Sequence, residues 1–216
     1  MSFTSFKTES RIFLFSKTSA LGVNHIPILD ATYLEPSITF SDYDYIIATS
    51  KEVFVALESL GDWRELPVLA ISEATAAYAR ELGARVLDVG EGYGRSIVNL
   101  VHKKYGHLKA LHPHAKVIAF DLNSALSELK IAVDSYVVYQ TKCADIGKVT
   151  LPDDAICLFS SPSAVECFAK NQEFLESYTV VCIGTTTQSA LPSGVVSTLA
   201  KETTIPSCIA QAKSLL

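Results

Sequence analysis

Short runs of apolar residues recur along the chain, and they show no alternation between apolar and polar positions. Strands buried on both faces have this pattern, as in a parallel sheet covered by helices. The predicted strands are RIFLF (11–15), DYIIA (44–48), PVLAI (67–71), KVIAF (116–120), AICLF (155–159) and TVVCI (179–183). Helix-like stretches lie between them, at 52–60, 73–83, 124–130, 164–171 and 187–194. This alternation predicts an α/β fold with right-handed crossovers.

The pattern of strand, turn and helix occurs twice, at a period of about 110 residues. The aligned pairs are Ser50 with Ser161, Thr75 with Thr187, Gly83 with Gly194 and, at the front of each half, Phe15 with Phe120. Each half is long enough for a small doubly wound sheet. The repeat predicts two similar flavodoxin-like parallel-sheet domains; the alternative is one longer sheet with chance similarity.

Two stretches, 28–34 and 134–142, alternate between polar and apolar positions and do not fit the core pattern. We interpret them as a pair of extended linker strands between the domains. Domain one then comprises residues 1–33 plus 143–216, and domain two comprises residues 34–138.

Hydroxyl side chains gather where strands end and helices begin, in the turns at 48–52, 71–75, 159–163 and 183–187. Ligands of open α/β sheets bind at the carboxyl ends of the strands, and helix N-termini there offer free N–H groups to anions. The simpler interpretation is helix capping, in which Ser and Thr are preferred; Thr185 is expected to cap its helix. Repetition in both halves favours a ligand cleft lined by both domains.

Composition restricts the function further. The chain has 216 residues and a net charge of −5, which argues against a general nucleic-acid-binding protein. No apolar run is long enough to cross a membrane, and the first residues are too polar for a signal peptide, so we expect a cytoplasmic protein. The five cysteines form no CxxC pair and are expected to be reduced thiols in the core.

Two stretches of possible chemistry are set aside. His107, His112 and His114 lie beside Pro113 in what we predict to be a solvated loop, and no acidic or cysteine ligand accompanies them at metal-site spacing. The glycine-rich stretch GEGYG (90–94) lacks both nucleotide-binding patterns.

Tyr139, within VVYQT, is predicted either to fill a contact between domains or to donate a proton in the cleft.

The turns IGTTT and FSSPSAV, the glycine-valine strand, their repetition and VYQT at the crossover together resemble the uroporphyrinogen-III synthase family. The resemblance covers nearly the whole chain. It departs from the family pattern at Ser72, where glycine is usual, at Ser160, where threonine is usual, and at Lys17, where arginine is common.

The resemblance implies an enzyme that closes linear hydroxymethylbilane into uroporphyrinogen III, with inversion of the last pyrrole ring and loss of water. It implies no metal or organic cofactor, and Tyr139 as the family's conserved tyrosine. A low-charge linker and the lack of an obvious exposed apolar patch lead us to expect a monomer. Its expected partners are the linear tetrapyrrole and, transiently, the preceding enzyme of the pathway, with neither nucleic acid nor membrane. Carried over from the family, the substrate-binding hydroxyls fall on Ser50, Thr75, Ser161, Ser163, Thr186 and Thr187. We add Lys17 as a candidate for substrate binding, although it stands where arginine is common.

The substrate carries eight carboxylates, so an acidic protein must bind it through local donors rather than bulk attraction. Two alternatives would keep the same repeat: a non-catalytic two-domain protein that binds or senses a small anion, and a structural interaction domain descended from the synthase.

Overall fold

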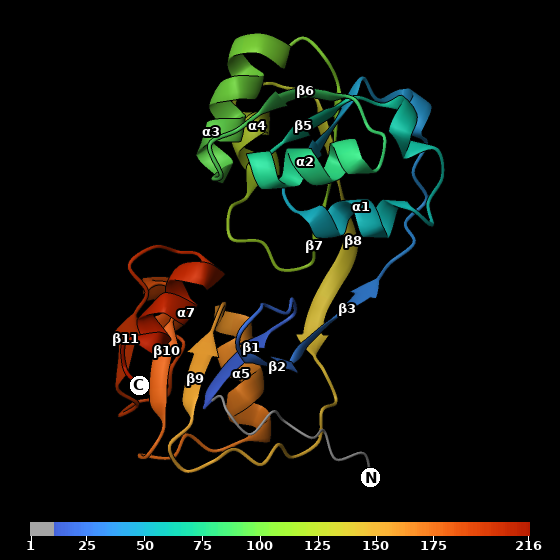
Figure 1. Cartoon of the computed structure of the whole chain (residues 1–216). Helices are drawn as coiled ribbons and strands as arrows, with labels where there is room; N and C mark the ends of the chain where they lie inside the picture. Colours follow the sequence, from blue (N-terminus) through green and yellow to red (C-terminus); the bar gives the residue numbers. More distant parts are fainter. Residues whose placement is uncertain (1–10) are drawn as a thin grey trace. The chain divides into compact units, whose positions relative to one another are not determined.

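The computed structural model describes residues 11–216, and the chain divides into two compact units. Unit 1 comprises Met1–Asp30 and Lys142–Leu216, and unit 2 comprises Ala31–Thr141. Figure 1 shows that each unit has its own sheet. Each unit also has its own apolar clusters.

The sheet of unit 1 has five parallel strands in the order β11-β10-β9-β1-β2. They are β1 (Ile12–Ser16), β2 (Asn24–Pro27), β9 (Ile156–Phe159), β10 (Thr179–Cys182) and β11 (Ser197–Leu199). The helices of this unit are α5 (Pro162–Asn171), α6 (Thr185–Gln188) and α7 (Ile205–Lys213).

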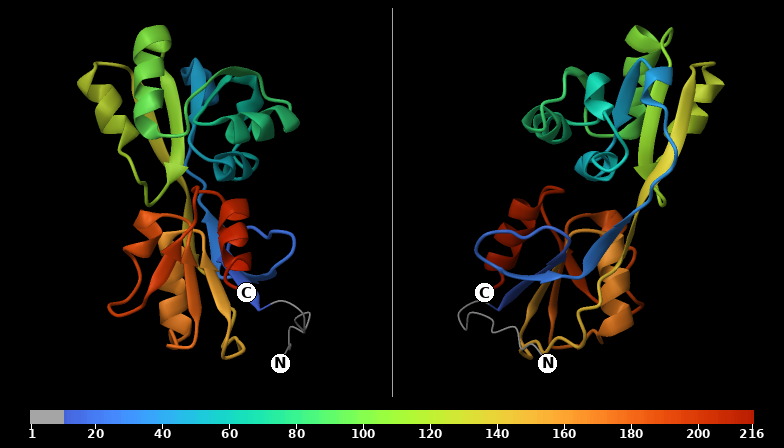
Figure 2. Two further views of the ribbon diagram at one scale, coloured as in Figure 1. Left: turned by 60° about the vertical axis from the view of Figure 1, so that its left-hand side comes forward. Right: turned by 90° about the vertical axis from the view of Figure 1, so that its right-hand side faces the viewer.

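Helices cover both faces of the unit 1 sheet, which explains the unbroken apolar runs. Phe13 and Phe15 of β1 pack in one cluster with Phe168 of α5, whereas Leu14 packs in another with Ile209 of α7. Figure 2 shows α5 and α7 on opposite sides of the strands. Because successive side chains of a strand point to opposite faces, every residue of β1 is buried.

The sheet of unit 2 has the order β3-β8-β7-β4-β5-β6, and its strands from β8 to β6 are parallel. They are β3 (Leu29–Tyr33), β4 (Tyr45–Ala48), β5 (Val68–Ala70), β6 (Val86–Val89), β7 (Ala110–Ala115) and β8 (Val133–Cys143). The helices are α1 (Lys51–Leu57), α2 (Glu73–Glu81), α3 (Gly94–Leu100), which continues as a π-helix (Val101–Tyr105), and α4 (Leu122–Glu128), with 3-10 turns at Phe40–Asp42 and Trp63–Glu65.

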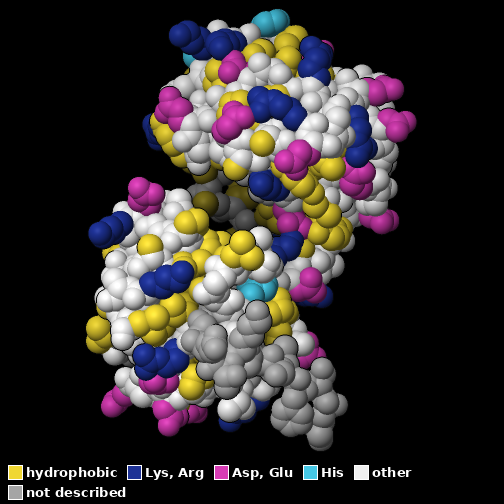
Figure 3. Space-filling model, viewed as in Figure 1, with side chains coloured by type: hydrophobic (Ala, Val, Ile, Leu, Met, Phe, Trp, Pro, Cys, Tyr) yellow, Lys and Arg dark blue, Asp and Glu magenta, His cyan; other side chains and the backbone are white. Residues whose placement is uncertain are grey.

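The helices of unit 2 also cover two faces. Ile46 and Val68 pack with α1 and α2, whereas Ile47 and Leu69 pack with α3 and α4. Both faces are visible in Figure 2. On the side of unit 2 seen in Figure 3, cationic and acidic side chains are interspersed, without the basic stripe of a nucleic-acid-binding surface.

The internal repeat is confirmed by topology. In unit 2, β4 lies between β5 and β7, and in unit 1, β9 lies between β10 and β1. The first hydroxyl turn of each unit follows β4 or β9, and the second follows β5 or β10. Ser50 and Ser161 are the N-caps of α1 and α5 with nearly the same backbone conformation. Gly83 and Gly194 both have positive φ, of 84° and 90°, just before β6 and β11. Only glycine adopts this conformation without strain.

Five of the six predicted strands are confirmed, but KVIAF (116–120) is wrong. The strand is β7, ALHPHA, which ends at Ala115, and residues 116–120 form a loop in which Val117 is 86% exposed. Two of the three histidines predicted to lie in a solvated loop, His112 and His114, are therefore on a strand, whereas His107 lies in an exposed turn before it. Pro113 is tolerated because β4 pairs only with Ala110 and Leu111 of β7, so no neighbour on that side needs its missing N–H. The repeat partner of β1 is β7, and the alignment of Phe15 with Phe120 is wrong.

The helix predicted at 187–194 is also shorter and earlier than expected, since α6 covers only Thr185–Gln188. The extended stretches at 28–34 and 134–142 do form neighbouring strands, β3 and β8. The Leu34 N–H donates to the Val138 carbonyl, and the Ala144 N–H donates to the Ile28 carbonyl, both at 2.9 Å. Residue 28 pairs with residue 144 and residue 34 with residue 138, so the two stretches run in opposite directions and the pair is antiparallel.

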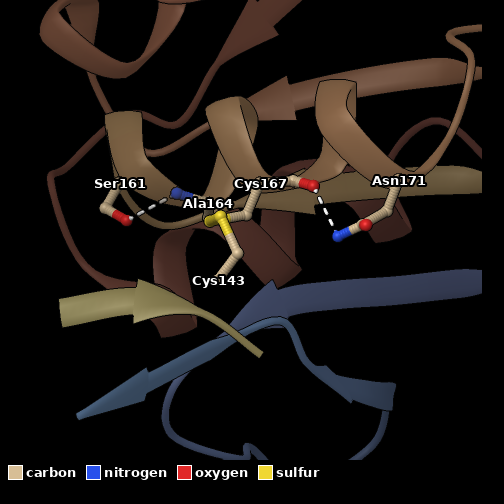
Figure 4. The surroundings of a disulfide bond; sticks show 5 residues. All are labelled: Cys143, Ser161, Ala164, Cys167 and Asn171. Atoms are coloured by element: carbon tan, nitrogen blue, oxygen red, sulfur yellow. Dashed lines mark hydrogen bonds between the residues drawn. A yellow bond between two sulfur atoms is a disulfide. The ribbon is translucent and has the colours of Figure 1, made fainter. Parts of the chain in front are cut away.

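The expectation of five reduced cysteines is wrong for two of them. Cys143, the last residue of β8, forms a disulfide with Cys167 on α5 (Figure 4). Cys157, Cys182 and Cys208 are free and buried, as expected. Burial raises the pKa of the Cys157 and Cys208 thiols to about 12, so neither is a reactive thiolate. Sequence spacing could not reveal the bridge, because β8 and α5 meet only in the folded unit.

Within residues 11–216, no helix has the length and apolar character needed to cross a membrane.

Candidate functional site

The carboxyl ends of β4 and β5 in unit 2 lead into helices that begin with a serine cap. Ser50 accepts a hydrogen bond from the Glu52 N–H at 3.1 Å, and Ser72 accepts one from the Thr75 N–H at 3.4 Å. Each serine thus satisfies one of the N–H groups that a helix start leaves without a partner. The capping interpretation of these turns is confirmed.

Tyr139 and Ser50 are brought together by the fold. Tyr139 lies on β8 and is half-buried, and its hydroxyl is 3.0 Å from Ser50 Oγ. Burial raises the pKa of the Tyr139 hydroxyl above its usual range, Glu52 raises it further, and the hydrogen bond with Ser50 partly opposes both. The phenol is therefore protonated at neutral pH and can donate a hydrogen bond.

A cavity of about 600 Å³ lies at this edge of unit 2, and both Ser50 and Tyr139 line it. Its volume is in the range of small-molecule sites. Most of its wall is apolar, since the loop after β7 contributes Val117, Ile118 and Phe120. Further lining residues are Thr49, Ile71, Gly92, Tyr93, Gly94, Arg95, His112, Ala115, Ala119 and Leu122.

The glycine-rich stretch GEGYG forms one side of this cavity, between β6 and α3. Ser96 Oγ accepts from the Glu91 N–H at 3.0 Å and donates to the Tyr93 carbonyl at 2.7 Å, which closes the loop on itself. A Cβ on Gly94 would lie 2.3 Å from the Phe120 ring, so glycine allows the apolar loop to pack directly on the start of α3. The sequence alone does not indicate a cavity here, because the stretch lacks both nucleotide-binding patterns.

His112 lies on β7 behind the cavity and is 2% exposed. Its Nδ1 is 3.3 Å from Ser135 Oγ, whereas Nε2 is buried and has no hydrogen-bond partner within residues 11–216. Burial, and secondarily the neighbouring His114, lower the pKa of His112 to about 3, so the ring is neutral at neutral pH. No group of three or more His, Cys, Asp or Glu suited to a metal ion occurs in the described part of the chain.

The two aligned threonines occupy equivalent buried positions. Thr75 and Thr187 are each the third residue of their helix, and they are 4% and 3% exposed. Thr75 Oγ1 lies 3.2 Å from Ser72 Oγ. In α6 the N-cap is Gly184, which has no side chain, so the expectation that Thr185 caps this helix is wrong.

The remaining predicted residues lie on the turns of unit 1. Ser161 caps α5 and accepts from the Ala164 N–H at 3.2 Å. Ser163 and Thr186 are exposed in the first turns of α5 and α6, and Lys17 is exposed directly after β1. The structure thus brings Tyr139 to Ser50 in unit 2, and it places Lys17, Ser161, Ser163, Thr186 and Thr187 on the carboxyl-end turns of unit 1.

The fold and the cavity define the class of protein. It is a two-unit α/β protein. The parallel strands of each sheet carry hydroxyl-bearing turns at their carboxyl ends, and unit 2 has a largely apolar cavity of about 600 Å³ there.

Comparison with known proteins identifies the family. The family model for uroporphyrinogen-III synthase HemD matches residues 22–210. The chain belongs to the uroporphyrinogen-III synthase family. No curated protein matches it significantly.

Solved structures agree. The uroporphyrinogen-III synthetase from Helicobacter pylori has a TM-score of 0.80 and 25% sequence identity, over 95% of this chain and 99% of that one. A mutant uroporphyrinogen III synthase from Thermus thermophilus has a TM-score of 0.56 and 16% identity, over 94% and 97%, which shows the shared fold alone.

Proposed function

We propose that this protein is a uroporphyrinogen-III synthase, a lyase of tetrapyrrole biosynthesis. It closes linear hydroxymethylbilane into uroporphyrinogen III, with inversion of the terminal pyrrole ring and loss of water. The observation that carries the proposal is the family match over residues 22–210, together with the likeness to the Helicobacter pylori protein across nearly the whole of both chains. No observation favours a non-catalytic binding or structural protein.

The chemistry asks for one proton transfer and for control of shape. The hydroxymethyl oxygen must take up a proton to leave as water, which produces a cationic azafulvene. Ring closure at the substituted carbon of the terminal pyrrole, through a spiro intermediate, then gives the type III isomer, and the last step returns a proton from carbon. Holding the flexible chain in one folded pose can contribute several kcal/mol.

Tyr139 is our proposed donor for the departing hydroxyl. Its phenol lines the cavity of unit 2, is protonated at neutral pH, and is held by Ser50 at 3.0 Å. Ser50 Oγ already accepts from the Glu52 N–H, so its own proton can be directed to Tyr139 or to substrate. The proton released after ring closure would restore the phenol for the next turnover.

The carboxylates of the substrate are proposed to bind at the carboxyl-end turns. Ser163 and Thr186 are exposed and can donate directly, and Lys17 adds a positive charge directly after β1. Helix starts favour anions through their N–H groups. Ser161 and Ser50 contribute as caps that shape their turns. Because Thr75 and Thr187 are buried, their contribution is to the form of the turn rather than to an open hydroxyl.

The decisive experiment supplies hydroxymethylbilane and measures the ratio of type III to type I uroporphyrinogen. The spontaneous reaction gives type I, so enrichment of type III is expected in the presence of the protein. A ratio equal to that of the protein-free control would refute the proposed activity.

We further propose that the enzyme works as a monomer in the cytoplasm and contacts the preceding enzyme of the pathway only transiently. Disulfides are rare in that compartment. Trapping the thiols of the protein in intact cells tests the location. Cys143 and Cys167 are placed to form the disulfide on oxidation, and a cytoplasmic location requires that they be largely reduced in the cell.

A further inference from the structure

The cavity of unit 2 contains one formally charged side chain. Among the described residues that line it, Arg95 alone carries a charge at neutral pH, since His112 is neutral there. Arg95 is the second residue of α3 and follows the glycine against which Phe120 packs. A single guanidinium therefore lies beside an apolar wall formed by residues 117–120.

Arg95 has no acidic partner in the part of the chain that the structure describes. The nearest carboxylate along the sequence, Glu91, instead accepts a hydrogen bond from the Tyr93 hydroxyl at 2.6 Å. By contrast, Arg64 and Arg80 of the same unit are paired with Glu58 and Glu73 at 2.5 Å and 2.6 Å. Arg95 thus keeps its donors available to a ligand.

The backbone on both sides of Arg95 is held in place. Gly90 and Gly92 donate to the carbonyls of Ala70 and Ile71 at 2.8 Å, and Ser96 ties the loop to the start of α3. Ile97, two residues after Arg95 on α3, is fully buried in a core cluster. A cation carried on so restrained a segment loses little conformational freedom on binding, apart from that of its own side chain.

We propose that Arg95 binds a carboxylate of the substrate while the apolar segment 117–120 packs against the pyrrole ring that carries it. This inference rests on the proposed function. Each pyrrole ring of hydroxymethylbilane is a flat, largely apolar ring with two carboxylate side chains, which matches an apolar wall beside one guanidinium. Arginine suits this role because its planar fork can hold a carboxylate through two parallel hydrogen bonds.

The test compares Arg95→Gln and Arg95→Lys with wild type, and uses Arg80→Gln as a matched control. Arg80→Gln removes the same charge from the same unit, at a residue that does not line the cavity. We expect Arg95→Gln to raise KM about tenfold or more, as for loss of a charged hydrogen-bonded pair, with kcat changed less than about threefold. Arg95→Lys keeps the charge without the fork, so its KM should lie in between.

Equilibrium binding of uroporphyrin III and of coproporphyrin III, which lacks the acetate carboxylates, gives a readout that needs no turnover. A loss of affinity for both in Arg95→Gln indicates a propionate partner, and a loss for uroporphyrin alone indicates an acetate partner. The inference is overturned if Arg95→Gln matches Arg80→Gln in KM and in both affinities while thermal melting shows both variants folded. Failure of the wild type to enrich the type III isomer would instead reject the proposed function. The comparison of porphyrin affinities would still test whether Arg95 binds a carboxylate.

Discussion

At the scale of single residues, the hydroxyls of Ser50 and Tyr139 meet although 89 positions separate them in the chain. The helix start places Ser50, and the strand β8 places Tyr139, so neither depends on a flexible loop. Both residues could be singled out from the sequence, Ser50 as a turn hydroxyl and Tyr139 as the tyrosine of VYQT at the crossover. Their contact could not, because it depends on which strands are neighbours.

We expect Tyr139→Phe to lower kcat by about tenfold or more, because it removes the proposed proton donor while retaining the ring. The stability cost should be about 1 kcal/mol, the value of one hydrogen bond. Steady-state kinetics and denaturant unfolding measure the two effects. Tyr136→Phe is the control, since Tyr136 is also on β8 and its hydroxyl lies 3.2 Å from that of Tyr43. Equal kcat values for the two variants would leave Tyr139 with a packing role.

The buried ring of His112 predicts that the stability of the protein depends on pH. Its pKa is about 3 in the folded protein, below the ordinary 6.5, so the unfolded chain binds a proton more readily between these values. Acidification through that range therefore favours unfolding, and the stabilisation present above pH 6.5 is progressively lost. One pKa unit corresponds to about 1.4 kcal/mol, so the loss from pH 7 to 4.5 is on the order of 3 kcal/mol.

Urea unfolding at several pH values measures this effect. His112→Gln should unfold with a shallower pH dependence than wild type between pH 4.5 and 7. The control is His107→Gln, because His107 is exposed on the surface of unit 2. The assignment to His112 fails if both variants retain the full acid dependence.

At the scale of elements, the apolar runs revealed the strands that are buried on both faces, and failed where one strand has unusual composition. β7 contains two histidines and a proline, yet its first four residues are buried. The more apolar KVIAF is a loop, with Val117 exposed beside the cavity. An apolar run alone cannot distinguish a strand buried in the core from a loop that lines a cavity.

The edge strand β2 is a real strand that no apolar run in the sequence predicts. Only Ile26 among its four residues is buried, so it carries no apolar run. Its place is set by pairing with β1, at Phe13 with Asn24 and Phe15 with Ile26. Short edge strands owe their existence to the neighbour they pair with, which a single-sequence pattern does not contain.

The disulfide joins β8 to α5, and we predict that it stabilises the folded protein. It closes a loop with a sequence separation of 24, for which loop entropy gives a stabilisation of about 3 kcal/mol. Reduction should therefore lower the midpoint of thermal unfolding of the wild type. A double variant, Cys143→Ser with Cys167→Ser, should melt at the lower temperature with or without reductant.

Thiol titration in denaturant provides the independent check. Three reactive thiols are expected before reduction and five after it, because Cys157, Cys182 and Cys208 are free. Five thiols in oxidatively purified protein would contradict the bridge. Insensitivity of the wild-type melting midpoint to reductant would show that the bridge adds no stability.

At the scale of the whole molecule, the repeat explains how one plan is used twice. The order β6-β5-β4-β7-β8 in unit 2 corresponds to the order β11-β10-β9-β1-β2 in unit 1. Ser50 and Ser161 cap the corresponding helices. The units have nevertheless diverged at these edges: unit 2 has Ser72 as a cap where unit 1 has Gly184, and α4 has no counterpart helix after β1. Motif spacing could predict the shared plan, whereas the differences depend on tertiary packing.

Unit 2 is a single stretch of chain, and this leads to the fourth prediction. Its two large apolar clusters contain only residues between 38 and 139, and its sheet is completed by β3 and β8. A domain with its own core can fold alone. We expect residues 31–141, expressed as a fragment, to unfold cooperatively on heating and to give dispersed amide NMR signals.

The fragment carrying Trp63→Ala is the control. Trp63 is fully buried against Phe54, with ring centroids 5.2 Å apart, so its loss should cost about 3 to 5 kcal/mol and abolish the cooperative transition of a small domain. If the unaltered fragment resembles this variant, unit 2 depends on the rest of the chain for its stability. If instead it folds and binds uroporphyrin with a loss on Arg95→Gln, then the cavity of unit 2 recognises a carboxylated pyrrole by itself.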